Sequence, residues 1–201
     1  VTGVQTCALP ICSMKEKRQV GWVILIAALM VGSASACDDP KDRPIRALLI
    51  TGGCCHDYPF QARQLIQAAK KRELDVDWTI VNEGGRTTAA QIDLYKDPNW
   101  ATGYDVIVHN ECFASTTDAD YIRSITQAHH AGANAIVIHC AMHSYRGAKI
   151  DDWREFLGVT SRRHEHKSEY PVSVTDKEHW ITKAIPEGYK TPSDELYVIE
   201  K

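Results

Sequence analysis

The sequence predicts an α/β protein with a doubly wound, mostly parallel sheet, because two patterns alternate along it. Short apolar runs typical of buried strands are followed by segments whose apolar residues recur at helical spacing. Units of this kind are joined by right-handed crossovers, which cover both faces of a parallel sheet with helices. The 201 residues, 44% hydrophobic and 24% charged, suit one globular domain.

Each expected element has its own signal in the chain. The strand-type runs lie at residues 46–51, 76–81, 104–109 and 133–139. Helices are expected at residues 60–72, 118–131 and 152–157. Weaker strand signals follow at residues 170–175 and 196–200. This order indicates a flavodoxin-like sheet, and because the last run stops at Lys201 we expect a C-terminally truncated reading frame.

The N-terminal residues are expected to lie outside this domain. Residues 1–13 resemble a translated sequencing adapter, so we interpret them as an adapter-derived or assembly scar that precedes a bacterial start at Met14. Residues 14–36 have the basic, apolar and small-residue regions of a secretory signal peptide. Their apolar run, residues 20–31, is shorter than the roughly 20 residues that span a membrane.

The cleavage site leaves two outcomes open. Residues 34–36, Ala-Ser-Ala, fit a signal-peptidase site, and together with Cys37 they also resemble a lipobox. We therefore expect an exported protein that is either periplasmic or a lipoprotein anchored through Cys37. Residues 37–44 would form a tether, and residues 45–201 the folded domain.

The charge of the chain argues against nucleic acid as a partner. Of 23 basic and 26 acidic residues, three basic and one acidic lie within residues 1–36, which leaves the remainder with a net charge of −5. Its basic block, residues 70–72, stands at an expected helix end, where cations complement the helix dipole. A small molecule is the expected partner, and contact with a membrane would come only from lipidation of Cys37.

Three expected strand ends carry much of the reactive chemistry. In an open parallel sheet, ligands bind beyond the carboxyl ends of the strands, where the strand order reverses. There the sequence has Gly-Gly-Cys-Cys-His-Asp at 52–57, His-Asn-Glu-Cys at 109–112 and His-Cys-Ala-Met-His at 139–143. In a 2-1-3-4 strand order these ends are neighbours, so the sequence predicts a functional site there.

One chemistry for that site is a divalent metal ion, zinc or a similar ion. Neutral imidazoles and a carboxylate are suitable ligands, and a catalytic site uses about three of them. The expected ligands are His109, Glu111, His139 and His143. His56 and Asp57 would close the site, and Glu111 and His143 are also candidate catalytic residues. No helix is predicted at residues 140–144.

A second chemistry is nucleophilic, with Cys140 at a strand-to-loop turn. Hydrolases and amidotransferases of this architecture carry their nucleophile there, and a nearby histidine would lower its pKa. The cysteines leave another choice open. In an oxidising compartment Cys54 or Cys55 could pair with Cys112 or Cys140, or these residues could remain buried or free thiols.

Candidate substrate-binding residues surround these strand ends. Gly53 would allow a tight turn and a close approach of the ligand. Arg162 and Arg163, with His164 beside them, could bind a hydroxyl-rich or anionic ligand, and solvated loop charge is the equal alternative. The full candidate set is Gly53, His56, Asp57, Asn110, Arg146, Arg162, Arg163 and His164.

Four separated blocks resemble one known family. They are Leu-Leu-Ile-Thr-Gly-Gly-Cys-Cys-His-Asp-Tyr at 48–58, Tyr-Asp-Val-Ile-Val-His-Asn-Glu-Cys-Phe-Ala at 104–114, Val-Ile-His-Cys-Ala-Met-His-Ser-Tyr-Arg at 137–146 and Asp-Glu-Leu-Tyr at 194–197. Together these blocks look like the ThuA-like, or trehalose-utilization, family, and the resemblance runs from about residue 45 to residue 201.

The resemblance implies a class I glutamine amidotransferase-like fold and a role in carbohydrate metabolism, on keto-sugars or glycosides. It carries His139 and the catalytic candidate Glu195 over from the family, with His143 beside them. Two departures accompany it: a His-Pro-Ile-Thr block appears as His-Trp-Ile-Thr at 179–182, and family members continue past residue 197 with further strands and a helix. Amidotransferase activity is not expected, because Gly-x-Cys-x-Gly is absent from the sequence.

Three functional hypotheses follow. The first is an exported, metal-assisted enzyme that acts on a sugar or glycoside. The second is a non-catalytic carbohydrate-binding or interaction module. The third is a hydrolase that depends on Cys140.

Overall fold

A central four-stranded parallel sheet organises the protein. The computed structural model describes residues 43–200, which belong to a compact unit spanning residues 38–201. The strands are β1 (Ile45–Gly53), β2 (Val76–Asn82), β3 (Val106–Cys112) and β4 (Ala135–Val137), in the order β2-β1-β3-β4. All three pairings are parallel, which confirms the predicted doubly wound α/β fold.

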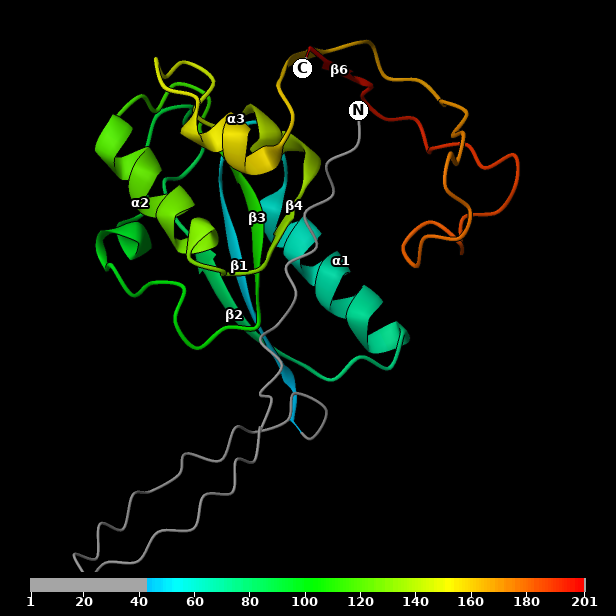
Figure 1. Ribbon diagram of the computed structural model, residues 1–201, viewed down its shortest axis with the longest axis horizontal. Helices are drawn as coiled ribbons and strands as arrows, with labels where there is room; N and C mark the ends of the chain where they lie inside the picture. The colour runs from blue at the N-terminus through cyan, green and yellow to red at the C-terminus, as the bar shows by residue number, and fades with distance from the viewer. Residues whose placement is uncertain (1–42, 201) are drawn as a thin grey trace, which may run out of the picture. The chain divides into compact units, whose positions relative to one another are not determined.

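Helices cover both faces of this sheet (Figure 1). They are α1 (Tyr58–Lys71), α2 (Ala119–His130) and α3 (Asp152–Leu157). Two short 3-10 helices, η2 (Asp93–Lys96) and η3 (His139–His143), lie in the connections after β2 and β4. Side chains alternate along β1: Leu48 and Ile50 pack with α2, whereas Leu49 packs with Ala62 of α1. Burial of apolar residues on both faces explains the continuous apolar runs in the sequence.

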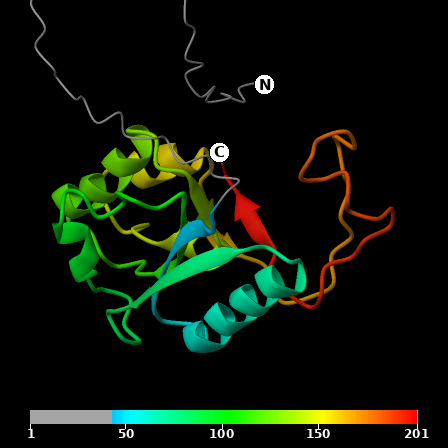
Figure 2. The same ribbon diagram turned by 90° about the horizontal axis from the view of Figure 1, so that it is seen from below.

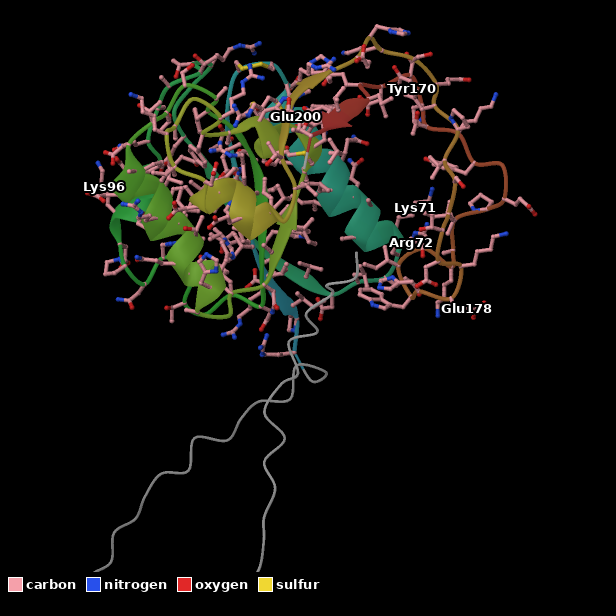
Figure 3. The ribbon with its side chains drawn as sticks, turned by 45° about the horizontal axis from the view of Figure 1, so that its top comes forward. Lys71, Arg72, Lys96, Tyr170, Glu178 and Glu200 are labelled. Atoms are coloured by element: carbon pink, nitrogen blue, oxygen red, sulfur yellow. A yellow bond between two sulfur atoms is a disulfide. The ribbon has the colours of Figure 1, made fainter. Side chains whose placement is uncertain are left out.

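Local signals in the sequence define the ends of the long helices. The carboxylate of Asp57 accepts a hydrogen bond from the backbone N–H of Phe60 and caps α1, and Asp118 caps α2 in the same way. The basic block ends α1, as predicted, and Figure 3 shows Lys71 and Arg72 at that helix end.

The C-terminal part departs from the expected pattern. The strand expected at residues 170–175 is absent from the described chain, where Pro171 forms only an isolated bridge. Instead β5 (Ser161–His164) pairs antiparallel with β6 (Tyr197–Ile199), and between them lies a long excursion with little regular structure (Figure 2). A second departure is η3, because a helical turn replaces the loop expected at residues 140–144.

The N-terminal predictions lie outside the described residues. These are the scar at 1–13, the signal peptide at 14–36, the acylation site at Cys37 and most of the tether. Within residues 43–200, the helices are too short or too polar to cross a bilayer.

Candidate functional site

The carboxyl ends of the parallel strands bring distant segments to one edge of the sheet. His56 lies in the loop after β1, and His139 is the first residue of η3, directly beyond β4. The third segment comes from the other end of the chain, where Glu195 lies two residues before β6. This edge is where the strand-order rule predicted a site.

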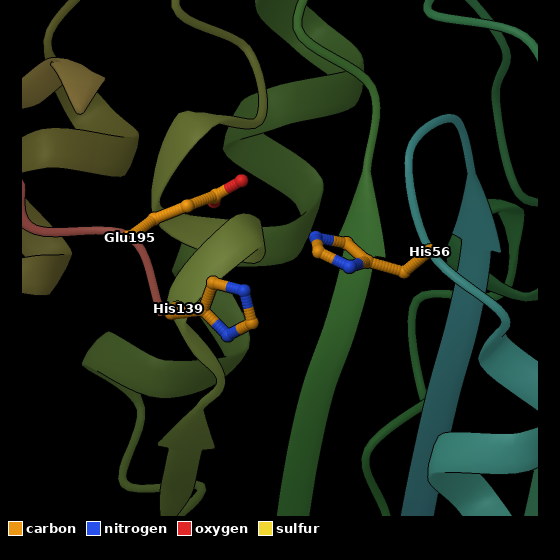
Figure 4. A group of neighbouring side chains, drawn as sticks. All are labelled: His56, His139 and Glu195. Atoms are coloured by element: carbon orange, nitrogen blue, oxygen red, sulfur yellow. The ribbon is translucent and has the colours of Figure 1, made fainter. Parts of the chain in front are cut away.

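His56, His139 and Glu195 form a group suited to a metal ion. Each contributes one potential ligand atom, and these atoms all lie within 4.8 Å of one another. The two imidazole rings are 4.9 Å apart between centroids, nearly perpendicular, and Figure 4 shows both rings and the carboxylate turned toward a common space. All three side chains are half-buried, so the ligand atoms are held in place and partly shielded from water.

The chemistry of His139 favours a cation over a proton. Its Nε2 atom is buried and has no hydrogen-bond partner among the described residues. Burial lowers the pKa of His139, and the neighbouring His56 lowers it further. A neutral imidazole with a free lone pair is the form that binds metal, so this site fits a divalent ion such as zinc.

Tyr197 forms one wall beside this group. Its ring stacks on His143 at 4.2 Å between centroids and lies 5.6 Å from His139. His143 has its Nε2 3.3 Å from the hydroxyl oxygen of Ser161 and is not one of the three grouped residues. Burial, followed by the positive charge of Arg146, lowers the pKa of His143 to about 4. His143 is therefore neutral at pH 7.

Glu195 lies next to two basic side chains at the outer side of the group. One carboxylate oxygen lies 3.7 Å from Nε2 of His164 and 4.0 Å from Nζ of Lys167. His164 and Lys167 are exposed, whereas the Glu195 side chain is only 14% exposed. The Glu195 carboxylate therefore has basic neighbours beyond the two grouped histidines.

His109 and Glu111, both predicted as ligands, lie in the protein core instead. The strand β3 continues to Cys112, so both residues belong to the strand and not to the loop beyond it. Alternation along the strand turns their side chains toward α2 and α3, where both are 0% exposed. Trp153 packs against the His109 ring, 5.3 Å away between centroids.

A buried hydrogen-bond chain explains what these core residues do. The Nδ1–H of His129 donates to the carbonyl oxygen of Ala133, so Nε2 of a neutral His129 accepts from Nε2–H of His109. Nδ1 of His109 lies 2.9 Å from Glu111 Oε1, which also accepts from the Tyr95 hydroxyl. The four side chains His129, His109, Glu111 and Tyr95 therefore form one buried hydrogen-bonded chain.

The cysteines at this edge adopt a pairing that the sequence did not indicate. Cys54 and Cys55 are bonded to each other in a disulfide, visible as the yellow bond in the loop after β1 in Figure 3. Cys112 and Cys140 are free and buried, with their sulfur atoms 2.8 Å apart. The alternative disulfide, from Cys54 or Cys55 to Cys112 or Cys140, is therefore not formed.

The two free thiols differ in acidity. The hydrogen bond between Cys140 and Cys112 and the positive potential of His56 outweigh burial and lower the pKa of Cys140 to about 6. The hydrogen bond with Cys140 and burial raise the pKa of Cys112 well above its ordinary range. Cys140 is therefore the more acidic of the two thiols.

The predicted substrate-binding residues divide between the site and the scaffold. Gly53 has φ of +98°, and an added Cβ would lie 2.2 Å from the carbonyl oxygen of Cys112, so this glycine serves the close packing of two strands. Asp57 caps α1. Asn110 donates its Nδ2–H to the side-chain oxygen of Gln61 on α1. These contacts give all three residues structural roles.

The arginines of the candidate set make their contacts around β5 and away from the grouped residues. Arg146 donates to the carbonyl oxygen of Arg162, and Arg162 lies 3.7 Å from the carboxylate of Glu200. Arg163 is paired with Glu165 on the surface. Of this segment only His164 reaches the grouped residues, through Glu195.

Tyr197 is the neighbour that sequence reasoning missed. A usable signal existed in Asp-Glu-Leu-Tyr at 194–197, because residues two apart in an extended segment point the same way. Glu195 and Tyr197 indeed both face the strand ends.

The chain belongs to the ThuA family, described as trehalose utilisation, because the family model matches residues 46–201. This confirms the family resemblance. No curated protein sequence matches the chain.

Two solved structures share the fold. A ThuA-like protein from Bacteroides uniformis ATCC 8492 is 19% identical, with a TM-score of 0.53, over 78% of this chain and 62% of that one. A ThuA-like protein from Parabacteroides merdae ATCC 43184 is 20% identical, with a TM-score of 0.50, over 77% of this chain and 63% of that one. The chain thus spans less than two thirds of the length of either structure.

Proposed function

We propose that this protein is a metal-assisted enzyme of carbohydrate metabolism that acts on a sugar or glycoside, including keto-sugars. The observation that carries the proposal is the group of His56, His139 and Glu195, whose ligand atoms lie within 4.8 Å of one another. Family membership supports the carbohydrate class of substrate. A divalent ion held by these residues would supply a Lewis acid to an oxygen-rich substrate.

The surrounding side chains suit a polyhydroxylated ligand. His164 is exposed and lies beside Glu195, so it can exchange a proton with a substrate hydroxyl while Glu195 orients its ring. The half-buried ring of Tyr197, backed by the buried ring of His143, forms a flat aromatic wall, a surface on which sugar C–H groups pack well. In the proposed reaction His164 moves the proton, and this wall positions the substrate.

Metal content tests the proposal directly. The purified 201-residue chain is expected to retain about one zinc or manganese ion after gel filtration, measured by inductively coupled plasma mass spectrometry. His139→Ala and His56→Ala should lose the ion. His143→Ala and the exposed control His179→Ala should keep it. A folded parent that binds neither ion would refute the metal-assisted function.

Two other functions remain as outcomes of an activity screen on sugars and glycosides. A Cys140-dependent hydrolase is favoured by the lowered pKa of that thiol beside His56. Its turnover would be lost in Cys140→Ser and survive a chelator, whereas the metal-assisted enzyme would show the reverse. Sugar binding without any turnover, unaffected by the chelator or by that substitution, would identify a carbohydrate-binding module.

The proposed location is outside the cytoplasm, in the periplasm or on a membrane through an acylated Cys37. It rests on the basic, apolar and small-residue pattern of residues 14–36. Mass spectrometry of the protein from a bacterial host distinguishes a cleaved chain, a lipidated chain and an uncleaved one. An uncleaved chain in the cytoplasm would contradict the proposed export.

A further inference from the structure

Four cysteines from three segments meet at the same edge of the sheet. Gly53, at the end of β1, lies opposite Cys112, at the end of β3, so Cys54 begins its loop directly beside that residue. Cys54 packs against a buried cluster that contains Tyr58, Cys112 and Cys140. The Tyr58 hydroxyl donates to the carbonyl oxygen of Cys54 and ties the loop to this cluster. A disulfide and a pair of thiols are therefore in contact.

The two pairs differ in their access to solvent. Cys112 and Cys140 are only 3% and 5% exposed, so reagents in solution have little access to either thiol. Cys54 is half-buried, and Cys55 is exposed. The disulfide thus extends from the buried thiols to the protein surface.

We infer that these four cysteines form one thiol–disulfide exchange centre, in which the buried pair and the surface pair share a single disulfide. The inference rests on the contact between Cys54 and the thiol pair, and on the 2.8 Å separation of the sulfur atoms of Cys112 and Cys140. It does not depend on a bound metal or on any sugar chemistry. The centre would interconvert a closed surface pair and a closed buried pair.

The exchange needs no external oxidant or reductant. The sulfur of Cys140 gives up its proton and attacks the sulfur of Cys54, the bond between Cys54 and Cys55 breaks, and Cys55 leaves and takes the proton. Cys112 then gives up its proton and attacks Cys140, and Cys54 leaves and takes that proton. One disulfide is reduced while one pair of thiols is oxidised, so electrons and protons balance.

A functional consequence follows from the difference in exposure. With the surface pair closed, the free thiols are buried and the protein presents no reactive sulfur at this edge. With the buried pair closed, Cys55 becomes an exposed thiol. The exchange therefore makes a nucleophilic thiol available to solvent beside His56.

Labelling of the native protein tests the inference. In the 201-residue chain with Cys7→Ser, Cys12→Ser and Cys37→Ser, one equivalent of diamide closes one disulfide, and excess N-ethylmaleimide then traps exposed thiols. Tryptic peptide 47–63 carries both Cys54 and Cys55, peptide 97–123 carries Cys112, and peptide 124–146 carries Cys140. Exchange predicts label on peptide 47–63 and a disulfide between peptides 97–123 and 124–146. Label confined to the buried cysteines, or a surface disulfide that never opens, would overturn the inference.

Two variants separate exchange from simple reduction. Cys112→Ala should stop at the intermediate, which appears as a disulfide between peptides 47–63 and 124–146. The Cys112→Ala/Cys140→Ala double variant should keep the surface disulfide closed and lower labelling of peptide 47–63 by about tenfold. Circular dichroism checks that both variants fold. Equal labelling of the double variant and the parent would contradict the exchange.

Discussion

The core position of Glu111 gives a prediction that separates a structural role from metal binding. In Glu111→Ala, His109 Nδ1 and the Tyr95 hydroxyl would both lose their carboxylate partner, 2.9 and 2.8 Å away, in a fully buried setting. The Tyr95 hydroxyl and His109 Nδ1 lie 3.3 Å apart and could then pair only with each other. Each buried group left unpaired costs about 1–3 kcal/mol, and the lost side-chain volume adds to this, so we expect the free energy of unfolding to fall by about 2–4 kcal/mol.

Glu111→Gln is the matched control, because the amide keeps the volume of the side chain. Its NH2 group can donate to His109 Nδ1, whereas the Tyr95 hydroxyl loses its carboxyl acceptor, so we expect a cost of about 1–2 kcal/mol. Urea unfolding followed by circular dichroism measures both costs. Metal content, measured on the folded fraction, should equal that of the parent. Unchanged stability together with a lost metal ion would refute the structural role.

Three further predictions concern other parts of the described chain. Gly53→Ala should lower the free energy of unfolding by about 3 kcal/mol or more, because a left-handed φ and a backbone clash combine there. Gly103→Ala is the control, because this glycine has φ of +90° but open space around it, and thermal unfolding should show a cost of only about 1 kcal/mol. Asp57→Ala should cost about 1 kcal/mol through loss of the α1 cap, and Asp57→Asn clearly less, in urea titrations. Burial lowers the pKa of His129 from 6.5 to about 4, so the unfolded chain binds the proton first. Stability should therefore decline as the pH falls from 6.5 toward 4, and His129→Gln should show a shallower decline in urea midpoints.

The fold class was predictable from sequence because its signals are local. Apolar runs, helical spacing and acidic helix starts each act within one element. Parallel strands buried on both faces leave continuous apolar runs, and the crossover rule then restricts the topology. The antiparallel pair of β5 and β6 was missed because an excursion of more than thirty residues separates its strands.

The sequence predicted where in the fold the candidate site lies, but not which side chains form it. Parallel strands bring their carboxyl ends to one edge, so the position of His139 followed from sequence, and the resemblance pointed to Glu195. The roles of His109 and Glu111 were not predictable, because a difference of one or two residues in the end of β3 decides whether they face the loop edge or the core.

The α/β class, the family and the edge of the sheet where reactive side chains gather all follow from local patterns in the amino-acid sequence. Which of those side chains meet follows only from the way the chain packs in three dimensions. His56, His139 and Glu195 come from widely separated parts of the chain, and Cys54 bonds to its own neighbour while Cys112 and Cys140 face each other. The physical reason is that composition and periodicity report burial and local conformation, whereas ligand groups and sulfur pairs depend on side-chain direction to within a few ångströms.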